Sequence, residues 1–552
     1  MKRIYSLLLL GGLLYAGNAF SQEVKLEKKV EKSLKKVKPN DIKNHIAYLA
    51  DDKLKGRLPG TEGYQMAVDY VIGKYTAMGI EPAGENGTYL QRVRIRKSVV
   101  APSATASFSN ATGTEETLAY GKDFALYPNL EEQNVTANVP LVFAGFGISA
   151  PDMGYDDYAS VDARGKIVVV FRGAPASFPS TVASASMDTQ VILQTAADHG
   201  AVGVIMASSN PTAPVGNLQR GVNSVMGPDG KVAVSRTFNE QIKLFGLVTE
   251  PVFQKLVQGS GLETEKTIAS LKAGTPVSTA LTTSLKASYT SSYEDIESYN
   301  VVGRITGSDP QLKNEYIVHS AHLDHVGIGR PINGDSIYNG AHDNASGVAS
   351  LLEIGKIYSR IKAKPKRSVL LVMVTAEEMG LLGSAYFAKN PTVPKENIVA
   401  DINTDMPTII APLLSAVPLG AAHSTLEQQV MQASAYLGID IEEDPEPEQN
   451  RFVRSDQYSF VSNGIPALHI KYGNKTADGK NNLDQFVKEW REVYYHKPQD
   501  GMDGIFDFEA GKRYVQLNFL IGYLVAQSSE RPSWKPGDYF GERFGQATSS
   551  VK

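Results

Sequence analysis

From about residue 286 onward, the pattern of apolar and polar positions alternates between two periods. Short apolar runs of strand length are followed by longer stretches in which apolar residues recur at helical spacing. The strand-like runs are residues 299–305, 316–322, 368–376, 397–403 and 465–473, and the clearest helical stretches are 346–361 and 425–439. Strands that alternate with helices predict an α/β domain with a mainly parallel, mixed sheet flanked by helices.

The region before residue 286 divides into two parts with different patterns. Residues 42–49 and 66–78 have helical spacing and are separated by a Gly- and Pro-containing loop at 56–63. Residues 101–285 are richer in Ala, Ser, Thr and Val, and their short strand-like runs include 139–148 and 166–173. We therefore expect residues 22–100 and 286–552 to build one domain, with residues 101–285 inserted as a second α/β domain.

The first 21 residues have the pattern of an export signal. Lys2 and Arg3 precede a short apolar stretch and then small residues, so that cleavage after Ala19 or Ser21 would fit. The apolar stretch is too short to cross a bilayer, and no later segment is long and apolar enough to do so. The sequence predicts a periplasmic or secreted protein without stable membrane insertion.

Composition excludes some further classes. The 552 residues are 42% hydrophobic and 21% charged, which is ordinary for a soluble globular protein of two or three domains. A net charge of −4 gives no basic excess for neutralising phosphates, so we expect no nucleic-acid partner. The absence of cysteine excludes a disulfide framework and a lipid anchor on cysteine. The oligomeric state is not predicted.

Candidate chemistry is concentrated between His319 and Asp343, where four of the nine histidines are interleaved with carboxylates. The pair Glu377–Glu378 follows after an apolar run, Asp405 follows another, and His496 comes much later. Imidazole and carboxylate are ligands that zinc prefers, and a further carboxylate beside them can act as a base. Each piece alone would be an ordinary turn, cap or surface residue, but together they indicate metal-assisted hydrolysis.

Five motifs in order, HLDH, DNASG, AEEMGLLGS, NTDM and YHKPQD, resemble those of the co-catalytic di-zinc aminopeptidase family. That family includes glutamate carboxypeptidase-like enzymes, the transferrin-receptor ectodomain and the glutaminyl cyclases. The stretch from 151 to 173 and the step DHGAVGVI resemble a protease-associated domain, which the family often carries as an insert. We expect this insert to border the cleft and limit which peptides enter.

The resemblance implies a role for each site residue. His322 and Asp405 would bind one zinc ion, Glu378 and His496 the second, and Asp343 would bridge the two. Asp324 would fix the tautomer of the His322 imidazole. Glu377 would be the general base that takes a proton from a hydroxide-forming water between the metals. The chain departs from commoner forms of the pattern at His342, Gln457 and Lys497, none of which is a predicted ligand. Three imidazoles remain: we expect His319 to be a buried strand residue, and His325 and His342 to be either structural or close to the pocket.

The resulting hypothesis is an exported metallopeptidase that removes N-terminal residues from peptides. Asp456 is a candidate partner for the α-ammonium group, although it could instead cap the helix that follows it. The alternative is a carboxypeptidase or dipeptidase on the same site, which would need a cationic pocket; Arg451 and Arg454 are candidates, unless they are only surface charges. A glutaminyl cyclase, which works with one zinc, and a non-catalytic ectodomain that has lost its ligands fit less well, because all five ligands and Glu377 are present.

Overall fold

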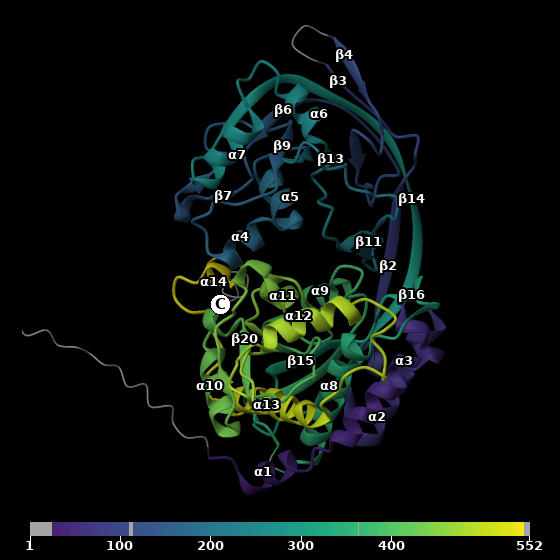
Figure 1. Cartoon of the computed structure of the whole chain (residues 1–552), viewed down its shortest axis with the longest axis vertical. Coiled ribbons are helices and arrows are strands. Elements are labelled where there is room, and N and C mark those ends of the chain that lie inside the picture. The colour runs from purple at the N-terminus through teal and green to yellow at the C-terminus, as the bar shows by residue number, and fades with distance from the viewer. Residues whose placement is uncertain (1–24, 110–113, 363, 546–552) are drawn as a thin grey trace, which may run out of the picture.

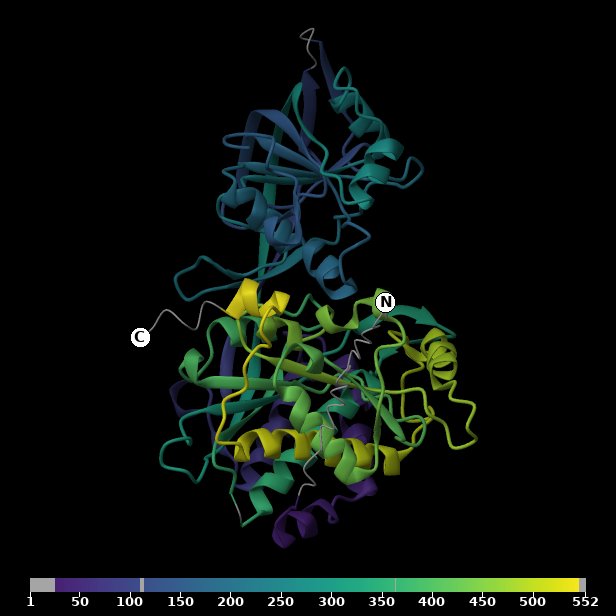
Figure 2. The same ribbon diagram turned by 90° about the vertical axis from the view of Figure 1, so that its left-hand side faces the viewer.

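The computed structural model describes residues 25–109, 114–362 and 364–545, so the predicted signal segment lies outside the described residues. The described chain forms two lobes stacked one on the other (Figures 1 and 2). The larger lobe is built from the N-terminal helices and the second half of the chain, and the smaller lobe contains most of residues 101–285. Within the described ranges, no helix combines the length and apolar character needed to cross a membrane.

The larger lobe contains a mixed sheet whose centre is parallel. β18, β15, β19 and β22 run parallel to one another; β14 and β20 pair antiparallel at the two sides of this group. Beyond them, β21 extends one side, and β2, β11 and β12 extend the other. The strands are β2 (Leu90–Val100), β11 (Val222–Met226), β12 (Val232–Val234), β14 (Ser278–Ile305), β15 (Tyr316–His322), β18 (Ser368–Val374), β19 (Ile398–Asn403), β20 (Ser415–Leu419), β21 (Asp440–Ile441) and β22 (Ala467–Tyr472). The short β1 (Glu81–Pro82) pairs with β14, and β16 (Gly327–Ile332) and β17 (Asp335–Tyr338) form a separate hairpin.

Helices cover both faces of this sheet. One face packs against α8 and α13, with α2, α3 and α10 around them, and the other against α9 and α11. The bounds are α1 (Lys28–Leu34), α2 (Pro39–Leu49), α3 (Glu62–Met78), α8 (Ser346–Arg360), α9 (Leu382–Lys389), α10 (Leu426–Leu437), α11 (Gln457–Val461), α12 (Leu483–Tyr494), α13 (Phe508–Gln527) and α14 (Tyr539–Phe544). The central strands are fully buried, which explains why they are continuous apolar runs in the sequence.

The smaller lobe has its own sheet, in the order β4-β3-β14-β6-β9-β10-β13-β5, with β6, β9, β10 and β13 parallel. Its strands are β3 (Thr105–Ser109), β4 (Glu115–Leu118), β5 (Phe124–Leu126), β6 (Asn134–Ala144), β9 (Ile167–Phe171), β10 (Gly203–Ala207) and β13 (Leu244–Val248). β7 (Ser149–Ala150) and β8 (Tyr155–Asp156) form a small hairpin, and the helices are α4 (Ser180–Ser186), α5 (Thr189–Asp198), α6 (Glu250–Leu256) and α7 (Thr264–Lys272).

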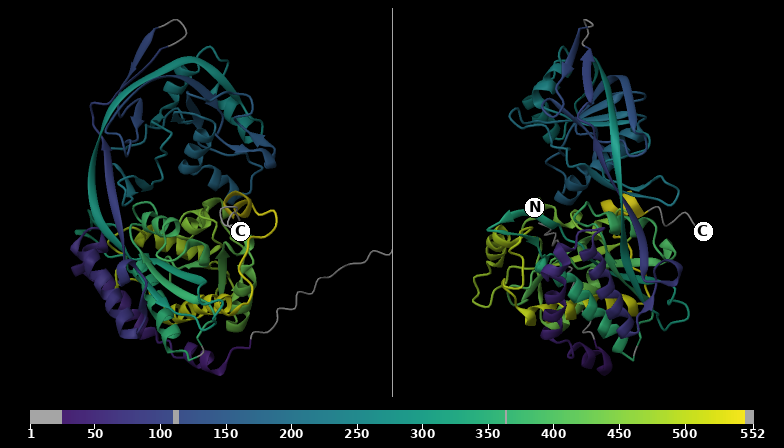
Figure 3. Two further views of the ribbon diagram at one scale, coloured as in Figure 1. Left: turned by 180° about the vertical axis from the view of Figure 1, so that it is seen from behind. Right: turned by 90° about the vertical axis from the view of Figure 1, so that its right-hand side faces the viewer.

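The two lobes share strands. β14 is 28 residues long and runs along one side of the molecule through both sheets (Figures 1 and 3). It therefore crosses the predicted boundary between residues 285 and 286 without a break. The β11–β12 hairpin lies inside the predicted insert, yet it pairs with β2 in the sheet of the larger lobe.

Candidate metal centre

The predicted ligands converge at the carboxyl ends of the parallel strands. His322 is the last residue of β15, Glu377 and Glu378 follow the end of β18, and Asp405 lies just beyond β19. Asp343 lies in a short π-helical turn, Ala341–Ala345, immediately ahead of α8. Because parallel strands end at one edge of a sheet, residues far apart in sequence meet here.

The carboxylate of Asp343 lies at the centre of the group. Its Oδ1 is 3.3 Å from His322 Nε2, and its Oδ2 is 3.1 Å from His496 Nε2. On one side, His322 Nε2 is also 3.3 Å from Asp405 Oδ1; on the other, His496 Nε2 is 3.2 Å from Glu378 Oε2. Each oxygen of Asp343 therefore faces a separate imidazole–carboxylate pair, which is the arrangement expected of a carboxylate that bridges two cations.

Burial and the crowding of carboxylates determine the charge of this site. Burial by itself would lower the pKa of His322, but Asp343 and Asp405 raise it well above the usual value. Burial also lowers the pKa of His496, but the carboxylates of Asp343 and Glu378 raise it to about 10. The pKa of Glu377 is raised well above its usual value, mainly by burial. The surrounding carboxylates therefore favour positive charge at this site.

The donor set fits divalent metal ions. One group of possible ligand atoms comes from His322, Asp343 and Asp405, and a second from His325, Asp343 and Glu378; within each group all ligand atoms lie within 4.8 Å of one another. Imidazole nitrogens and carboxylate oxygens suit zinc and similar ions. Two cations bound here would also neutralise the negative charge of the buried carboxylates.

Asp324 connects the first imidazole to the Glu377–Glu378 turn. Its carboxylate accepts hydrogen bonds from the backbone N–H groups of Glu377, at 3.1 Å, and Glu378, at 3.3 Å. His322 Nδ1 lies 3.2 Å from the backbone oxygen of Asp324 and 3.8 Å from its Oδ1. The expected orienting role toward His322 is therefore compatible with the geometry, and the fixing of the turn is an additional role that the sequence did not indicate.

Several hydrogen bonds hold Asp405. Ser455 Oγ donates to its Oδ2 at 2.7 Å, while its backbone oxygen lies 2.9 Å from His469 Nε2 and 2.8 Å from Lys471 Nζ. Asn344, next to the central Asp343, donates to Thr404 O at 3.0 Å, so the loops that carry the two carboxylates are tied together.

Two positioning residues were missed by the sequence analysis. Arg57 is 1% exposed, and its guanidinium donates to the backbone oxygens of Leu323, Leu49, Asn339 and Gly340. Burial lowers its pKa to about 10, so it stays charged at neutral pH.

The second is Asp500, which accepts hydrogen bonds from the backbone N–H groups of His342 and Asp343. In the sequence, the signals were only an arginine in a Gly/Pro loop and an aspartate four residues after His496, neither of which reveals a distant contact.

The three remaining imidazoles differ from one another. His319 is fully buried in β15, as expected, and burial lowers its pKa to about 3. His342 stacks on Phe506 at 4.2 Å, and burial lowers its pKa to about 4, so its role is structural. His325 Nδ1 lies 2.8 Å from Glu378 Oε1, which places this imidazole directly behind a predicted ligand. Gln457, one of the departures from the family pattern, is buried, and its side-chain oxygen accepts a hydrogen bond from the Asn403 amide.

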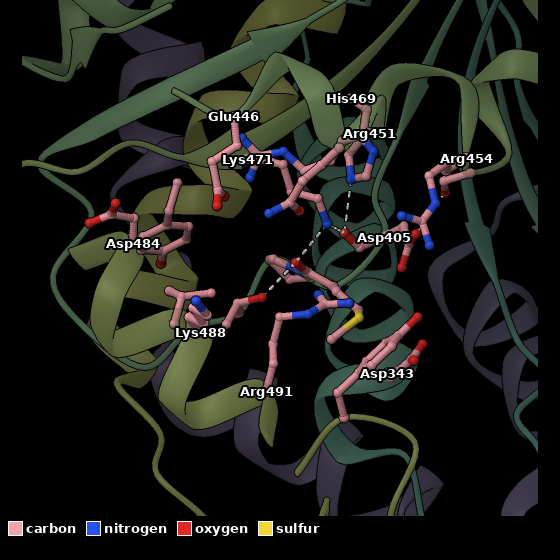
Figure 4. A pocket seen from close by; sticks show the side chains of 18 of the residues that line it. Asp343, Asp405, Glu446, Arg451, Arg454, His469, Lys471, Asp484, Lys488 and Arg491 are labelled. Atoms are coloured by element: carbon pink, nitrogen blue, oxygen red, sulfur yellow. Dashed lines mark hydrogen bonds between the residues drawn. The ribbon is translucent and has the colours of Figure 1, made fainter. Parts of the chain in front are cut away.

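A cavity of about 460 Å³ opens beside Asp343, Glu377, Asp405 and His496 (Figure 4). Arg451 and Arg454 both line it, as the alternative hypothesis required. Asp456 is fully buried and is not among the lining residues. It occupies the N-cap position of α11, but its side chain makes no capping hydrogen bond. Both roles considered for Asp456, binding of the substrate ammonium and capping, are therefore unsupported by this geometry.

The inserted lobe does not border this cavity. All lining residues lie between 343 and 496, whereas the insert was expected to form part of the cleft wall. The described residues of the insert instead contact the larger lobe through β11, β12 and α4.

Comparisons with known proteins agree with this architecture. Residues 300–514, which contain all five predicted ligands, match Peptidase family M28, and residues 136–242 match the PA domain. Leupeptin-inactivating enzyme 1 of Streptomyces exfoliatus is 32% identical over 238 residues, which cover 42% of this chain and 50% of that protein. A protein named probable leucine aminopeptidase 2 of Aspergillus oryzae is 28% identical over 39% of this chain and 42% of its own length.

Two further proteins are also similar to this chain. Carboxypeptidase Q of Mus musculus is 32% identical over 120 residues, 21% of this chain and 23% of that protein. The structure of an aminopeptidase from Aneurinibacillus sp. strain AM-1 aligns with a TM-score of 0.47 at 19% identity, covering 92% of this chain and 97% of the other. The matches to these curated relatives span half of their length or less. With its ligand-type residues grouped at the strand ends, the larger lobe carries a segment, residues 300–514, that matches peptidase family M28, and the smaller lobe carries a segment, residues 136–242, that matches the PA domain.

Proposed function

We propose that this chain is an exported di-zinc peptidase that removes residues from the amino terminus of peptides. The observation that carries the proposal is the position of Asp343, whose two oxygens face His322 and His496 on opposite sides. His322 and Asp405 would hold one ion and Glu378 and His496 the other. Bound there, two zinc ions would supply Lewis acidity to an attacking water and to the scissile carbonyl.

Glu377 is the residue that moves protons in this proposal. It lines the cavity beside Asp343 and Asp405, while its backbone is held by Asp324. Its carboxylate takes the proton of the attacking water and passes it to the departing amine. The neighbouring Glu378 contacts His496 and His325 instead, so the two adjacent glutamates face different partners.

The choice of the amino end is supported by similarity to a protein named probable leucine aminopeptidase 2. With Asp456 buried, the carboxylates available to an α-ammonium group are those that line the cavity, among them Glu446 and Glu492. A second candidate, a carboxypeptidase or dipeptidase, is favoured by five cationic residues in the lining: Arg451, Arg454, Lys471, Lys488 and Arg491.

Metal analysis of purified variants tests whether Glu377 acts as the base and Glu378 as a metal ligand. The wild-type chain should bind two zinc ions and lose activity with a chelator. Glu377→Gln should keep both ions and lose about 10²–10⁴ in kcat, because an amide cannot accept the proton. Glu378→Gln should bind one ion fewer. Equal metal content in the two variants would contradict the assignment.

The end of the peptide that is recognised needs a separate experiment. A long peptide with a free amino terminus should be cleaved, and acetylation of that terminus should abolish cleavage, whereas amidation of its distant carboxyl terminus should have little effect. The opposite result would favour the carboxypeptidase alternative. Export is tested by sequencing the amino terminus of the mature protein, which should begin after residue 19 or 21.

A further inference from the structure

The lining of the cavity contains many positively charged side chains. Arginine and lysine side chains enter it from three parts of the chain: the segment before α11, strand β22 and helix α12 (Figure 4). Its volume is within the usual size for a small-ligand pocket. Charged side chains in such a pocket select the charge of the ligand.

Two of the five cations already have partners inside the protein. Arg451 forms an ion pair with Asp444, and Lys471 Nζ donates to the backbone oxygens of Asp405 and Met406. These interactions inside the protein hold both side chains in the cavity wall and reduce their availability to a ligand.

The other three cations are Arg454, Lys488 and Arg491. Among the described residues, no carboxylate lies within 4.0 Å of their charged nitrogens. Lys488 has Asp484 and Glu492 one turn away on the same exposed helix face, so it is the weaker candidate for an external ligand. Arg454 is exposed at the rim of the cavity, and Arg491 is half-buried.

Arg491 is held in position by aromatic stacking. Its guanidinium carbon lies 3.8 Å from the centre of the Tyr495 ring, and this ring stacks on the His496 imidazole at 3.9 Å. One ring therefore separates the guanidinium from a predicted metal ligand, and Figure 4 shows the side chain extending from α12 into the cavity. These two ring spacings together are close to the span of two extended residues, each about 3.3–3.6 Å long, so a carboxylate on a residue next to the scissile bond is within reach of Arg491.

We propose that Arg491 binds a carboxylate of the substrate, with Arg454 adding positive charge at the rim of the same cavity, so that the enzyme prefers peptides with negative charge adjacent to the scissile bond. This inference rests on the proposed peptidase function and adds the chemical class of its substrate. A guanidinium fixed by stacking presents its paired N–H groups to a carboxylate in bidentate geometry. The carboxylate is either an acidic side chain or the terminal carboxylate of a short peptide.

Matched peptides separate these two sources. For the side chain, Leu-Glu-Ala-amide is compared with Leu-Gln-Ala-amide, and Glu-Ala-amide with Gln-Ala-amide. For the terminus, Leu-Ala is compared with Leu-Ala-amide. The metal-replete full chain should show a kcat/KM ratio of about 10 to 100 in favour of the charged member of at least one pair, the usual size of a hydrogen bond to a charged group.

The variants then assign that preference to residues. Arg491→Gln should reduce the ratio of the preferred pair to near 1, Arg491→Lys should give an intermediate ratio, and Arg454→Gln should give a partial loss. Lys480→Gln is the matched control, because Lys480 pairs with Asp478 and lies outside the cavity lining; this variant should retain the full ratio. Loss of the preference in Lys480→Gln as well would indicate a general charge effect and overturn the assignment.

Binding provides a measurement that does not depend on turnover. Glu377→Gln should bind the charged peptide of the preferred pair about 10-fold or more tightly than its neutral partner, measured by calorimetric titration. Equal Kd values, or equal cleavage of all pairs by the wild type, would overturn the carboxylate site while leaving the peptidase function intact. Failure to cleave any of the peptides, together with unequal Kd values, would overturn the peptidase function and leave the carboxylate site standing.

Discussion

At the residue scale, Arg57 connects three parts of the chain around the site. Its guanidinium joins a loop near the amino terminus to the residue after His322 and to the turn that leads into Asp343. Four backbone oxygens depend on it for hydrogen bonds. In addition, its positive charge lies near the buried carboxylates Asp324 and Asp343.

We expect Arg57→Lys to destabilise the protein although it keeps the charge. A single ammonium group cannot reach all four carbonyls, and the free energy of unfolding should fall by about 2–4 kcal/mol as buried acceptors lose their donors. Urea unfolding measures this loss. Arg164→Lys, at an exposed ion pair, should leave the unfolding midpoint unchanged. An Arg57→Lys midpoint equal to wild type would show that the guanidinium contacts are dispensable.

The contrast between Arg57 and the predicted metal ligands shows which kinds of residue a sequence can identify. Metal binding restricts the residue types at a few positions, so His322, Asp343 and Glu378 stand out from their motifs and lie together in the structure. Arg57 acts through backbone oxygens up to 283 positions away, which any residue type supplies. Asp456 illustrates a different limit: its neighbours Arg454 and Ser455 line the cavity, but its own side chain is buried and is not part of the lining.

At the element scale, the strands next to the site follow the hydrophobic pattern closely. The predicted strand 316–322 coincides with β15, and the predicted helix 346–361 with α8. β14 is the exception, since residues 278–298 contain many Ser and Thr residues and their apolar alternation is confined to Leu285, Ala287 and Tyr289. Its length comes from pairing with strands of both lobes, and such tertiary pairing overrides local propensity.

Close contact between α13 and β15 gives a prediction at this scale. A Cβ atom added at Gly522 of α13 would lie 2.2 Å from Nε2 of the buried His319 and 3.0 Å from the Tyr358 hydroxyl. We expect Gly522→Ala to lower the free energy of unfolding by about 1–3 kcal/mol, because a packed ring cannot move aside.

Gly73 in α3 is the matched control for this substitution. It has no atom within 4 Å of an added Cβ and is exposed, so Gly73→Ala should raise stability by about 0.5–1 kcal/mol through helix propensity. Thermal unfolding of the two variants tests how tightly α13 packs against β15. If both substitutions shift Tm in the same direction, the contact between α13 and β15 is not as tight as the structure indicates.

At the scale of the whole molecule, the inserted segment contacts the larger lobe at two places near the site: its β11–β12 hairpin packs beside the Glu377–Glu378 turn, and α4 packs against residues 447–453 of the cavity wall. Val225 of β11 belongs to an apolar cluster with Ala376 and Leu382, which lie on either side of Glu377 and Glu378. The inserted lobe also contacts α9 through Lys389, whose Nζ donates to Ala233 O at 2.8 Å. Because the insert contributes no lining residue, any influence on catalysis should pass through such contacts, and the contact at Val225 is the one next to Glu377 and Glu378.

We therefore expect a cavity at Val225 to affect turnover, whereas an equal cavity elsewhere in the insert should not. Val225→Ala and Val169→Ala both remove two methyl groups from fully buried valines on strands, and each should cost about 2 kcal/mol of stability. Val169 packs in the core of the smaller lobe, in a different apolar cluster from Ala376 and Leu382. Loosening the turn should lower kcat of Val225→Ala by about 3- to 10-fold, since small displacements of a catalytic group are costly. In steady-state kinetics, with both variants more than nine-tenths folded at the assay temperature, Val169→Ala should retain wild-type kcat. Equal kcat values in the two variants would mean that the insert does not act through the Glu377–Glu378 turn.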